Sequence, residues 1–257
     1  MNILDQFSLR DKVIVLTGGA GLYGRQLTRA LADAGAKLVI ASRNLENLKK
    51  IAEEKSDREI FCEALDQGDE KSILDLRDRV REKFGRVDGL VNNSVTRTMK
   101  SLDDTLASWE QSIRVNATGV FLMTRAFGEI MCRQNSGSIV NVGSMQGMVG
   151  PSPELYDGTN MGVPPPDYFF HKAGMINLSR YFASVYGKNN VRVNCVSPGG
   201  FFNNQPEPFL GNYNRQTMLG RMADENDLGG AIVFLLSEAS RYVTGVNLPV
   251  DGGYTAK

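Results

Sequence analysis

A tyrosine and a lysine lie four positions apart, at Tyr168 and Lys172, in a stretch whose apolar spacing predicts a helix over 167–187. Residues four apart on a helix share one face and are close enough to interact. A free tyrosine has a pKa of about 10 and is a poor acid–base group at neutral pH, but a neighbouring ammonium favours its phenolate form. The pair therefore suits general acid–base catalysis on a hydroxyl or a carbonyl group.

A serine that follows a predicted buried strand could serve the same reaction. The strand is expected over 137–142, and Ser144 emerges just beyond it. Because ligands of a parallel sheet lie outside the carboxyl ends of its strands, we expect Ser144 to donate to the substrate oxygen while Tyr168 donates or removes its proton.

A second tyrosine competes for the acid–base role. Tyr156 also follows Ser144, but the residue four positions beyond it is Asn160, which carries no charge. We therefore assign the role to Tyr168. Two loops, at about 145–167 and 198–222, are richer in proline and glycine than a plain connection needs. The substrate contacts that we expect in or beside them are Ser144, Gln146, Tyr156, Gly200 and Asn204.

The N-terminal region carries a glycine-rich turn. The first predicted strand runs straight into residues 17–24 and then into a helix, and Gly19, Gly21 and Gly24 fit the pattern G-x-G-x-x-G in the strand–turn–helix context that it requires. Small residues let the backbone approach a pyrophosphate, and the helix N-terminus presents free N–H groups and a positive dipole end to it. The turn therefore predicts a dinucleotide site.

The end of the second predicted strand indicates which dinucleotide binds. An acidic residue here would accept a hydrogen bond from the ribose 2′-hydroxyl and repel a 2′-phosphate. The chain instead has the neutral Ser42 and then Arg43, which can pair with a phosphate in a two-pronged manner. This favours NADP(H), with NAD(H) as the alternative. Asp66, just past the third strand, could reach the adenine amine or could instead cap a turn.

Asn116 lies inside a long helical pattern over 103–134. Asparagine is a middling helix former whose side chain competes for backbone hydrogen bonds. One interpretation is a local distortion that holds a water linking Lys172 to solvent; the other is a plain interior polar residue.

Apolar runs alternate with amphipathic segments along the whole chain. The alternation predicts an α/β fold, a doubly wound Rossmann-type sheet of about seven parallel strands with helices on both faces, in one domain over 1–257. Gly35, Gly85 and Gly187 are expected to end helices, and Asp224 to cap the last one. The predicted strands are 12–17, 37–42, 59–65, 89–92, 137–142, 191–196 and 246–250. The predicted helices are 23–34, 44–56, 69–84, 103–134, 167–187 and 224–237.

The composition excludes several classes of protein. Lys+Arg and Asp+Glu are both 29, so net charge favours neither nucleic acid nor an anionic membrane. The N-terminus has no apolar stretch of signal-peptide length, and no run is long enough to span a bilayer. Three widely spaced cysteines and a single histidine form no recognisable metal site. We expect three buried thiols and a reducing cytoplasm.

Taken together, these residues resemble the short-chain dehydrogenase/reductase family over essentially the whole chain. The matching pieces are 17–24, Asp66, Asn92-Asn93, Asn116, Ser144, Tyr168 with Lys172, Arg192-Val193-Asn194, Ser197-Pro198-Gly199 and Val250-Asp251-Gly252-Gly253. The resemblance implies a catalytic set of Asn116, Ser144, Tyr168 and Lys172, with Lys172 also holding the nicotinamide ribose. It implies homotetramers or dimers joined through the helices that carry Asn116 and Tyr168. The coenzyme contacts that it implies are Thr17, Gly18, Gly19, Gly21, Leu22, Tyr23, Gly24, Ser42, Arg43, Asn44, Asp66, Gln67, Asn92, Asn93, Ser94, Tyr168, Lys172, Pro198, Gly199 and Phe201.

The chain departs from the family pattern at several positions. Leu22 replaces the second glycine of the usual T-G-x-x-x-G-x-G, and Ser94-Val95 replaces Ala-Gly after the paired asparagines. Bulky residues, including His171, fill the usually small gap between tyrosine and lysine; we expect them to pack at a subunit interface or under the inserted loop, with His171 structural. The interval from Ser144 to Tyr168 is about ten residues longer than usual. The added loop, where it could cover the substrate, contains Glu154, Tyr156, Asp157 and Asn160.

The loops suggest a substrate class. The lengthened loop and the segment 197–207 resemble a branch of the family associated with sugar acids and bacterial surface sugars, and hydroxyl-rich substrates need several side-chain acceptors and amides. We therefore expect hydride transfer between a nicotinamide and a carbonyl or secondary alcohol of a small sugar or sugar-acid substrate. The alternatives are a 3-oxoacyl-thioester reductase, which would want an open apolar groove, and a non-catalytic NADPH sensor of the same fold.

Overall fold

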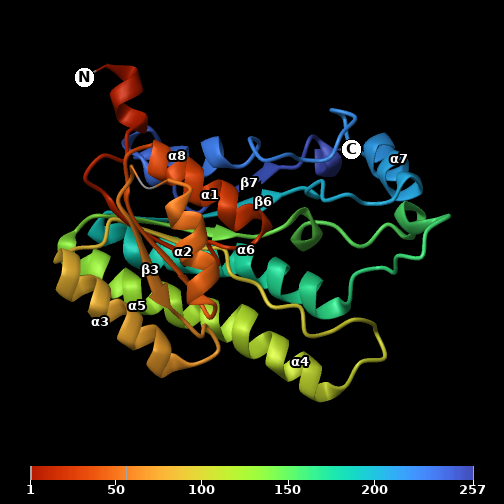
Figure 1. The fold of residues 1–257 in the computed structure, drawn as a ribbon, viewed down its shortest axis with the longest axis horizontal. Helices are drawn as coiled ribbons and strands as arrows, with labels where there is room; N and C mark the ends of the chain where they lie inside the picture. The colour runs from red at the N-terminus through yellow and green to blue at the C-terminus, as the bar shows by residue number, and fades with distance from the viewer. Residues whose placement is uncertain (1, 56, 257) are drawn as a thin grey trace.

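The computed structural model describes residues 2–55 and 57–256. Its centre is one all-parallel sheet with the strand order β3-β2-β1-β4-β5-β6-β7 (Figure 1). The strands are β1 (Val13–Thr17), β2 (Lys37–Ser42), β3 (Ile60–Ala64), β4 (Gly89–Asn92), β5 (Gly137–Val142), β6 (Val191–Pro198) and β7 (Asn247–Val250). The order reverses between β1 and β4, and a crevice for a ligand forms at such a reversal.

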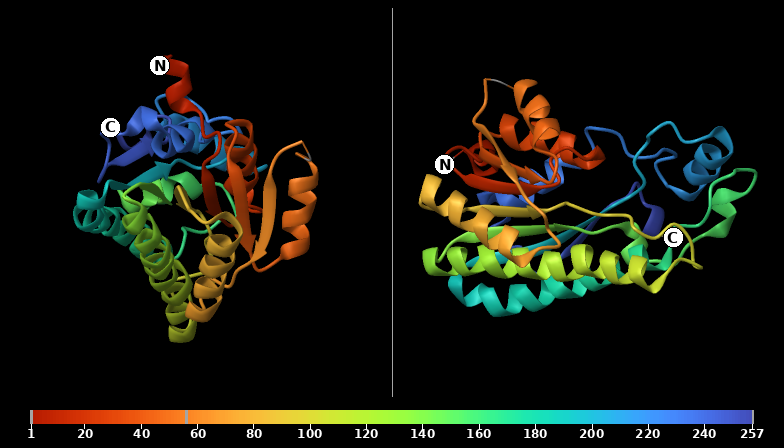
Figure 2. Two further views of the ribbon diagram at one scale, coloured as in Figure 1. Left: turned by 90° about the vertical axis from the view of Figure 1, so that its left-hand side faces the viewer. Right: turned by 60° about the horizontal axis from the view of Figure 1, so that its bottom comes forward.

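Helices cover both faces of this sheet (Figures 1 and 2). Apolar side chains of α3, α5 and α6 form one core with the strands, and those of α1, α2 and α8 form the other. The helices are α1 (Leu22–Asp33), α2 (Leu45–Glu53), α3 (Glu70–Phe84), α4 (Leu106–Ile113), α5 (Gly119–Gln134), α6 (Pro166–Tyr186), α7 (Glu207–Gln216) and α8 (Gly229–Leu236). Because both faces are covered, every residue of β1 and β4 is buried, which explains their apolar sequences.

The predicted doubly wound parallel sheet is confirmed. The predicted helix over 103–134 is in fact two α-helices, α4 and α5, joined by a π-helical segment at Arg114–Thr118. Helix α7 was not predicted, because its segment begins among prolines and carries only a weak apolar pattern. The predicted helix over 44–56 ends at Glu53, and position 56 lies outside the described residues, as do positions 1 and 257 of the predicted domain.

The predictions about helix ends differ in outcome, and the one for Asp224 is wrong. Helix α8 begins at Gly229, so Asp224 does not cap it; the Asp224 carboxylate instead accepts a 2.8 Å hydrogen bond from the Asn226 N–H in a turn. Gly187 directly follows the end of α6, as predicted, but its φ of −56° is right-handed, and Asn190 takes the left-handed conformation after a 3-10 turn. Gly85 does end α3 in that conformation, as predicted.

Three further findings concern the cysteines, metal ligation and membrane spans. Cys195 is buried, whereas Cys62 and Cys132 are only half-buried, contrary to prediction. Within the described ranges, no group of three or more His, Cys, Asp or Glu side chains could hold a metal ion. Among the same residues, no helix has both the length and the apolar character needed to cross a bilayer.

Candidate active site

A cleft of about 900 Å³ lies along the carboxyl edge of the sheet. The glycine-rich turn at one side and the Tyr168–Lys172 pair at the other line the same cleft. Between and around them, the predicted site residues that line it are Gly18, Gly21, Leu22, Tyr23, Gly24, Ser42, Arg43, Asp66, Gln67, Asn93, Ser94, Ser144, Gln146, Tyr156, Pro198, Gly199, Gly200 and Phe201. Tertiary structure therefore brings together segments that are far apart in the sequence.

The glycine turn is shaped by one left-handed residue and one close approach of the backbone. Gly18 has a left-handed φ of +69°, and a Cβ built on Gly24 would lie 2.0 Å from the Gly18 carbonyl oxygen. Only glycine fits at position 24, because no side chain can displace that backbone. Gly21 is the N-cap of α1 and offers no side chain, so the first N–H groups of the helix stay open to a ligand. The turn therefore fits a pyrophosphate.

Two predicted coenzyme contacts support the turn from behind it and do not line the cleft. The Thr17 hydroxyl accepts hydrogen bonds of 3.0 Å from the N–H groups of Asn93 and Ser94. Gly19 packs against Ile40, where a Cβ would meet side-chain carbon at 2.9 Å.

The end of β4 is joined to the same turn. The Asn93 amide donates to the carbonyl oxygens of Thr17 and Gly18, at 3.1 Å each. Asn92, in contrast, is buried away from the cleft and donates to Asn141 and Thr124.

The adenosine side of the cleft is lined by Ser42, Arg43, Asp66 and Gln67. Asp66 lines the cleft and also accepts a 2.9 Å bond from the Gly68 N–H, so the proposed turn and the proposed contact are compatible. The Oε1 atom of Gln67 is buried and has no hydrogen-bond partner among the described residues. Asn44 lies outside the lining, because its side chain caps α2 through the Asn47 N–H.

The Lys172 ammonium is buried at the reacting side of the cleft. Its Nζ donates a 2.5 Å hydrogen bond to the Val142 carbonyl and lies 5.7 Å from the centroid of the Tyr168 ring. Burial lowers the pKa of Lys172, while its interaction with Tyr168 acts in the opposite direction. The ammonium is therefore fixed beside the phenol by its bond to β5.

Ser144 is held with its hydroxyl proton available. It is buried at the end of β5, and its Oγ accepts a 3.1 Å bond from the Gln146 N–H. This bond uses an oxygen lone pair and leaves the O–H free to donate to a substrate oxygen.

Tyr156 lies in a different part of the site. It belongs to the 3-10 turn Pro153–Tyr156, and its ring packs 5.4 Å from that of Phe209 on α7. Burial raises the pKa of Tyr156 to about 12, which disfavours the phenolate. Tyr156 thus forms part of a cover built from the inserted loop and α7, which we call the lid. Of the loop that we expected to cover the substrate, Glu154, Asp157 and Asn160 do not line the cleft.

The nicotinamide side predicted around Pro198-Gly199 is closed by aromatic rings. The Tyr23 hydroxyl donates to the Gly199 carbonyl at 2.8 Å, and its ring lies 5.3 Å from that of Phe201. Asn204 lies outside the lining of the cleft. Its neighbours Asn203 and Gln205 line it instead.

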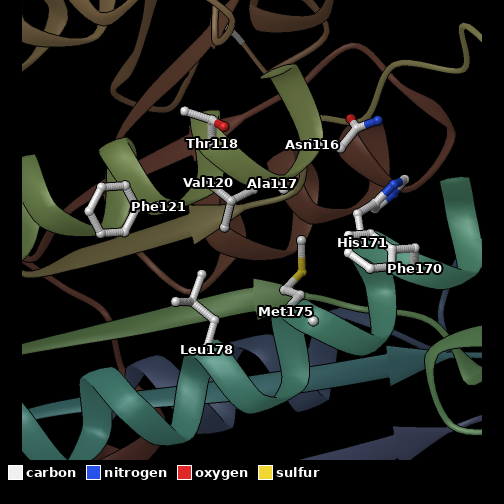
Figure 3. A pocket seen from close by; sticks show the side chains of 10 residues that line it. Asn116, Ala117, Thr118, Val120, Phe121, Phe170, His171, Met175 and Leu178 are labelled. Carbon is white, nitrogen blue, oxygen red and sulfur yellow. The ribbon is translucent and has the colours of Figure 1, made fainter. Parts of the chain in front are cut away.

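Asn116 lies in the π-helical segment, where a distortion was expected, but it does not line the cleft. Its side-chain oxygen accepts from the Thr96 N–H, and its amide nitrogen donates to the Thr96 carbonyl and to Ser112. Asn116 instead borders a second pocket, of about 350 Å³, between α5 and α6. Figure 3 shows it close to His171 in that pocket, which we call the groove.

Sequence reasoning missed two charged residues of the site. Asp167, directly before Tyr168, is buried and accepts a 2.5 Å hydrogen bond from Ser112. The guanidinium carbon of Arg97 lies 5.1 Å from the centroid of the Tyr168 ring. Arg97 lies only four positions after Asn93, so its position close to a recognised motif could have predicted it as a site residue.

The fold and this cleft define an NAD(P)-dependent oxidoreductase of the Rossmann type. A family model described as enoyl-(acyl carrier protein) reductase matches residues 21–255. The chain belongs to the short-chain dehydrogenase/reductase family, and it acts on CH–OH or C=O groups.

Three relatives illustrate the range of this family. The chain is 34% identical to a 3-oxoacyl-(acyl-carrier-protein) reductase from Thermotoga maritima, over 95% of this chain and 98% of the relative. It is 31% identical to the post-translational flagellin modification protein A of Campylobacter coli, over 96% and 99% of the two chains. A gluconate 5-dehydrogenase from Burkholderia cenocepacia, solved in complex with NADP and tartrate, matches with a TM-score of 0.90, 27% identity and full coverage of both chains.

Proposed function

We propose that this enzyme prefers NADP(H) and interconverts a secondary alcohol and a carbonyl of a sugar or sugar acid. The observation that carries this proposal is the single cleft in which Tyr168, Lys172 and Ser144 face the same space as the glycine turn. The chain would act as one NAD(P)-binding domain over 1–257, with substrate loops at about 145–167 and 198–222.

Each residue of the proposed catalytic set has a distinct role. In the reductive direction, Tyr168 donates its phenolic proton to the substrate oxygen, and Ser144 donates a hydrogen bond to the same oxygen. The Lys172 ammonium stabilises the phenolate that remains and binds the nicotinamide ribose. Bound coenzyme supplies the hydride for reduction or accepts it for oxidation. Asn116 acts indirectly, through the π-helical segment that it anchors to Thr96, by supporting the relay of a proton from Lys172.

The preference for NADP(H) rests on the end of β2. Arg43 is exposed at the adenosine side of the cleft, and neutral Ser42 stands before it. A guanidinium can bind the 2′-phosphate with two parallel hydrogen bonds, and no carboxylate of β2 opposes it. NAD(H) would bind without that contact.

The lid favours a small, hydroxylated substrate over a long acyl chain. Tyr156 packs against Phe209, and the Asn212 amide donates to the carbonyl oxygens of Leu155 and Asp157, so the loop and α7 cover the reacting side together. Similarity to the gluconate 5-dehydrogenase and to the flagellin modification protein supports a sugar-acid or surface-sugar substrate. Similarity to the 3-oxoacyl reductase supports the thioester alternative.

We further propose self-association, as a dimer or tetramer, in the cytoplasm. The groove between α5 and α6 is lined mainly by apolar side chains, and Phe121 and Phe170 are exposed there (Figure 3). Contiguous apolar surface of this kind marks protein contacts. The bulky residues between Tyr168 and Lys172 contribute to the groove through Phe170, which also packs 5.4 Å from Trp109.

A substrate panel tests the proposal. The protein is mixed with NADP⁺ and sugar acids, or with NADPH and keto-sugars or 3-oxoacyl thioesters, and the absorbance of NADPH is followed. Turnover of the sugar compounds is expected. Turnover of the thioesters alone would establish the acyl alternative, and tight NADPH binding without any turnover would establish the sensor.

A further inference from the structure

Arg97 is a cation at the reacting side of the cleft, and no described residue provides a counter-ion for it. It follows β4, lines the cleft, and places its guanidinium carbon 5.1 Å from the centroid of the Tyr168 ring. Its guanidinium forms no ion pair with any carboxylate in residues 2–55 and 57–256. A contact with an aromatic face leaves the N–H donors at the edge of the guanidinium free, so Arg97 can still bind an anion in the plane of its fork.

The charges around Arg97 are unbalanced in favour of cations. At the reacting side, Lys100 and Lys172 line the cleft with it, and Lys100 Nζ donates to the Arg97 carbonyl at 3.1 Å. Among the described residues, the carboxylate that lines the cleft there is that of Asp167, so cations outnumber carboxylates at this side. Burial is the main cause of the lowered pKa of Lys172, and the positive charge of Arg97 makes a smaller contribution in the same direction. A bound anion would offset this repulsion.

We propose that Arg97 binds a carboxylate of the substrate, so that the enzyme acts on hydroxy and keto acids in preference to neutral sugars. This inference rests on the proposed function and specifies its substrate class. The planar fork of arginine matches a carboxylate with two parallel hydrogen bonds. The guanidinium lies over the ring of Tyr168. A carboxylate bound to Arg97 would therefore be close to a carbon that reacts at Tyr168, close enough for both to belong to one small molecule. If the substrate were a thioester of an acyl carrier protein, the acidic surface of the carrier would stay outside the cleft and could not supply the anion that Arg97 binds.

A matched pair of polyols tests this assignment. D-Gluconate and D-sorbitol share a six-carbon hydroxylated chain and differ in a carboxylate at one end. With NADP⁺, we expect Arg97→Ala to lower kcat/KM for gluconate by about 10- to 100-fold, the range expected for a lost charge-assisted hydrogen bond. Arg97→Lys should recover part of this loss, and kcat/KM for gluconate should fall at least about tenfold more than kcat/KM for sorbitol. An equal loss for both substrates, or no loss for either, would overturn the proposal.

A binding measurement separates this proposal from the proposed function. Calorimetry with the NADP⁺ complex reports gluconate binding whether or not hydride is transferred. If Arg97→Ala loses gluconate binding and the wild type binds gluconate without turning it over, the anion site is supported and the assigned reaction is rejected. No gluconate binding to the wild type, or tighter binding of sorbitol 6-phosphate, would overturn the carboxylate site. Arg10→Ala removes an exposed arginine before β1, at the opposite edge of the sheet, and should change neither measurement.

Discussion

The hydroxyl of Ser112 donates a 2.5 Å hydrogen bond to the buried carboxylate of Asp167 and so ties α4 to the first turn of α6. The same hydroxyl accepts a 3.0 Å bond from the Asn116 amide. A chain of hydrogen bonds therefore runs from Asn116 through Ser112 to Asp167, the residue directly before Tyr168. Two members of the proposed catalytic set are positioned relative to each other by this buried link.

We expect Ser112→Ala to lower kcat by roughly tenfold while leaving the NADPH dissociation constant within about twofold. Loss of the hydroxyl leaves the Asp167 carboxylate without its hydrogen bond, at a cost of about 1–3 kcal/mol. Rotation of the carboxylate and of the Asn116 amide should then move the start of α6. Steady-state kinetics with a coenzyme titration provide the measurement.

Ser138→Ala is the matched control for this substitution. Ser138 is also buried, and its hydroxyl donates to the Leu235 carbonyl at 2.7 Å, but it lies at the start of β5, away from the cleft. It should lose comparable stability and keep its kcat. If both variants lost kcat to the same extent, the Ser112 link would be purely structural.

Tyr168→Phe should reduce kcat by roughly 10²- to 10⁴-fold, the range associated with a general acid–base group, and leave coenzyme affinity nearly intact. The phenyl ring keeps the contacts of Tyr168 with Arg97 and Lys172, so only the proton-transferring hydroxyl is lost. Stopped-flow single turnovers measure the chemical step, and fluorescence measures NADPH binding. Retained activity would transfer the role elsewhere, and Tyr156→Phe would then be the variant to compare.

Arg43→Asp should weaken NADPH binding by about 10- to 100-fold and affect NADH much less. The substitution replaces a partner of the 2′-phosphate with a carboxylate that repels it and can accept from a 2′-hydroxyl. Dissociation constants of both coenzymes for both proteins provide the test. A similar loss for the two coenzymes would show that Arg43 does not contact the 2′-phosphate.

The stability of the protein should fall with acid partly because of His171. Burial, with smaller contributions from the Lys172 and Arg97 charges, lowers the pKa of His171 from 6.5 to about 3. As the pH falls, His171 is therefore protonated near pH 6.5 in the unfolded chain but only near pH 3 in the folded chain. Stability is complete above this window and is lost as pH falls through it, by up to about 5 kcal/mol.

His171→Phe removes the titrating ring at similar size. Its free energy of unfolding, measured with urea at several pH values, should depend less on pH between about 6.5 and 3 than that of the wild type. If the free energy of unfolding depended on pH equally in both proteins, the pKa of His171 would be the same in the folded and the unfolded chain.

Local patterns in the sequence predicted the sheet and much of the cleft. The strands of a doubly wound sheet are buried on both faces, so their apolar runs are visible without any tertiary information. The glycine turn was predictable for a similar reason, because the close approach of Gly24 to the Gly18 carbonyl depends on residues only six apart. Lys172 and Tyr168 are one helical turn apart, and their closeness also follows from local geometry.

Only the tertiary structure decided which polar residues line the cleft and which support it. Thr17 and Asn92 belong to motifs of the family, yet their side chains do not line the cleft. They form hydrogen bonds within the protein, because buried polar groups need partners. Asp167 and Arg97 acquire their roles from residues on other elements, Ser112 on α4 and Tyr168 on α6. Contacts between distant segments leave no periodic trace in the sequence, and so the charge balance around the substrate became visible only in the folded chain.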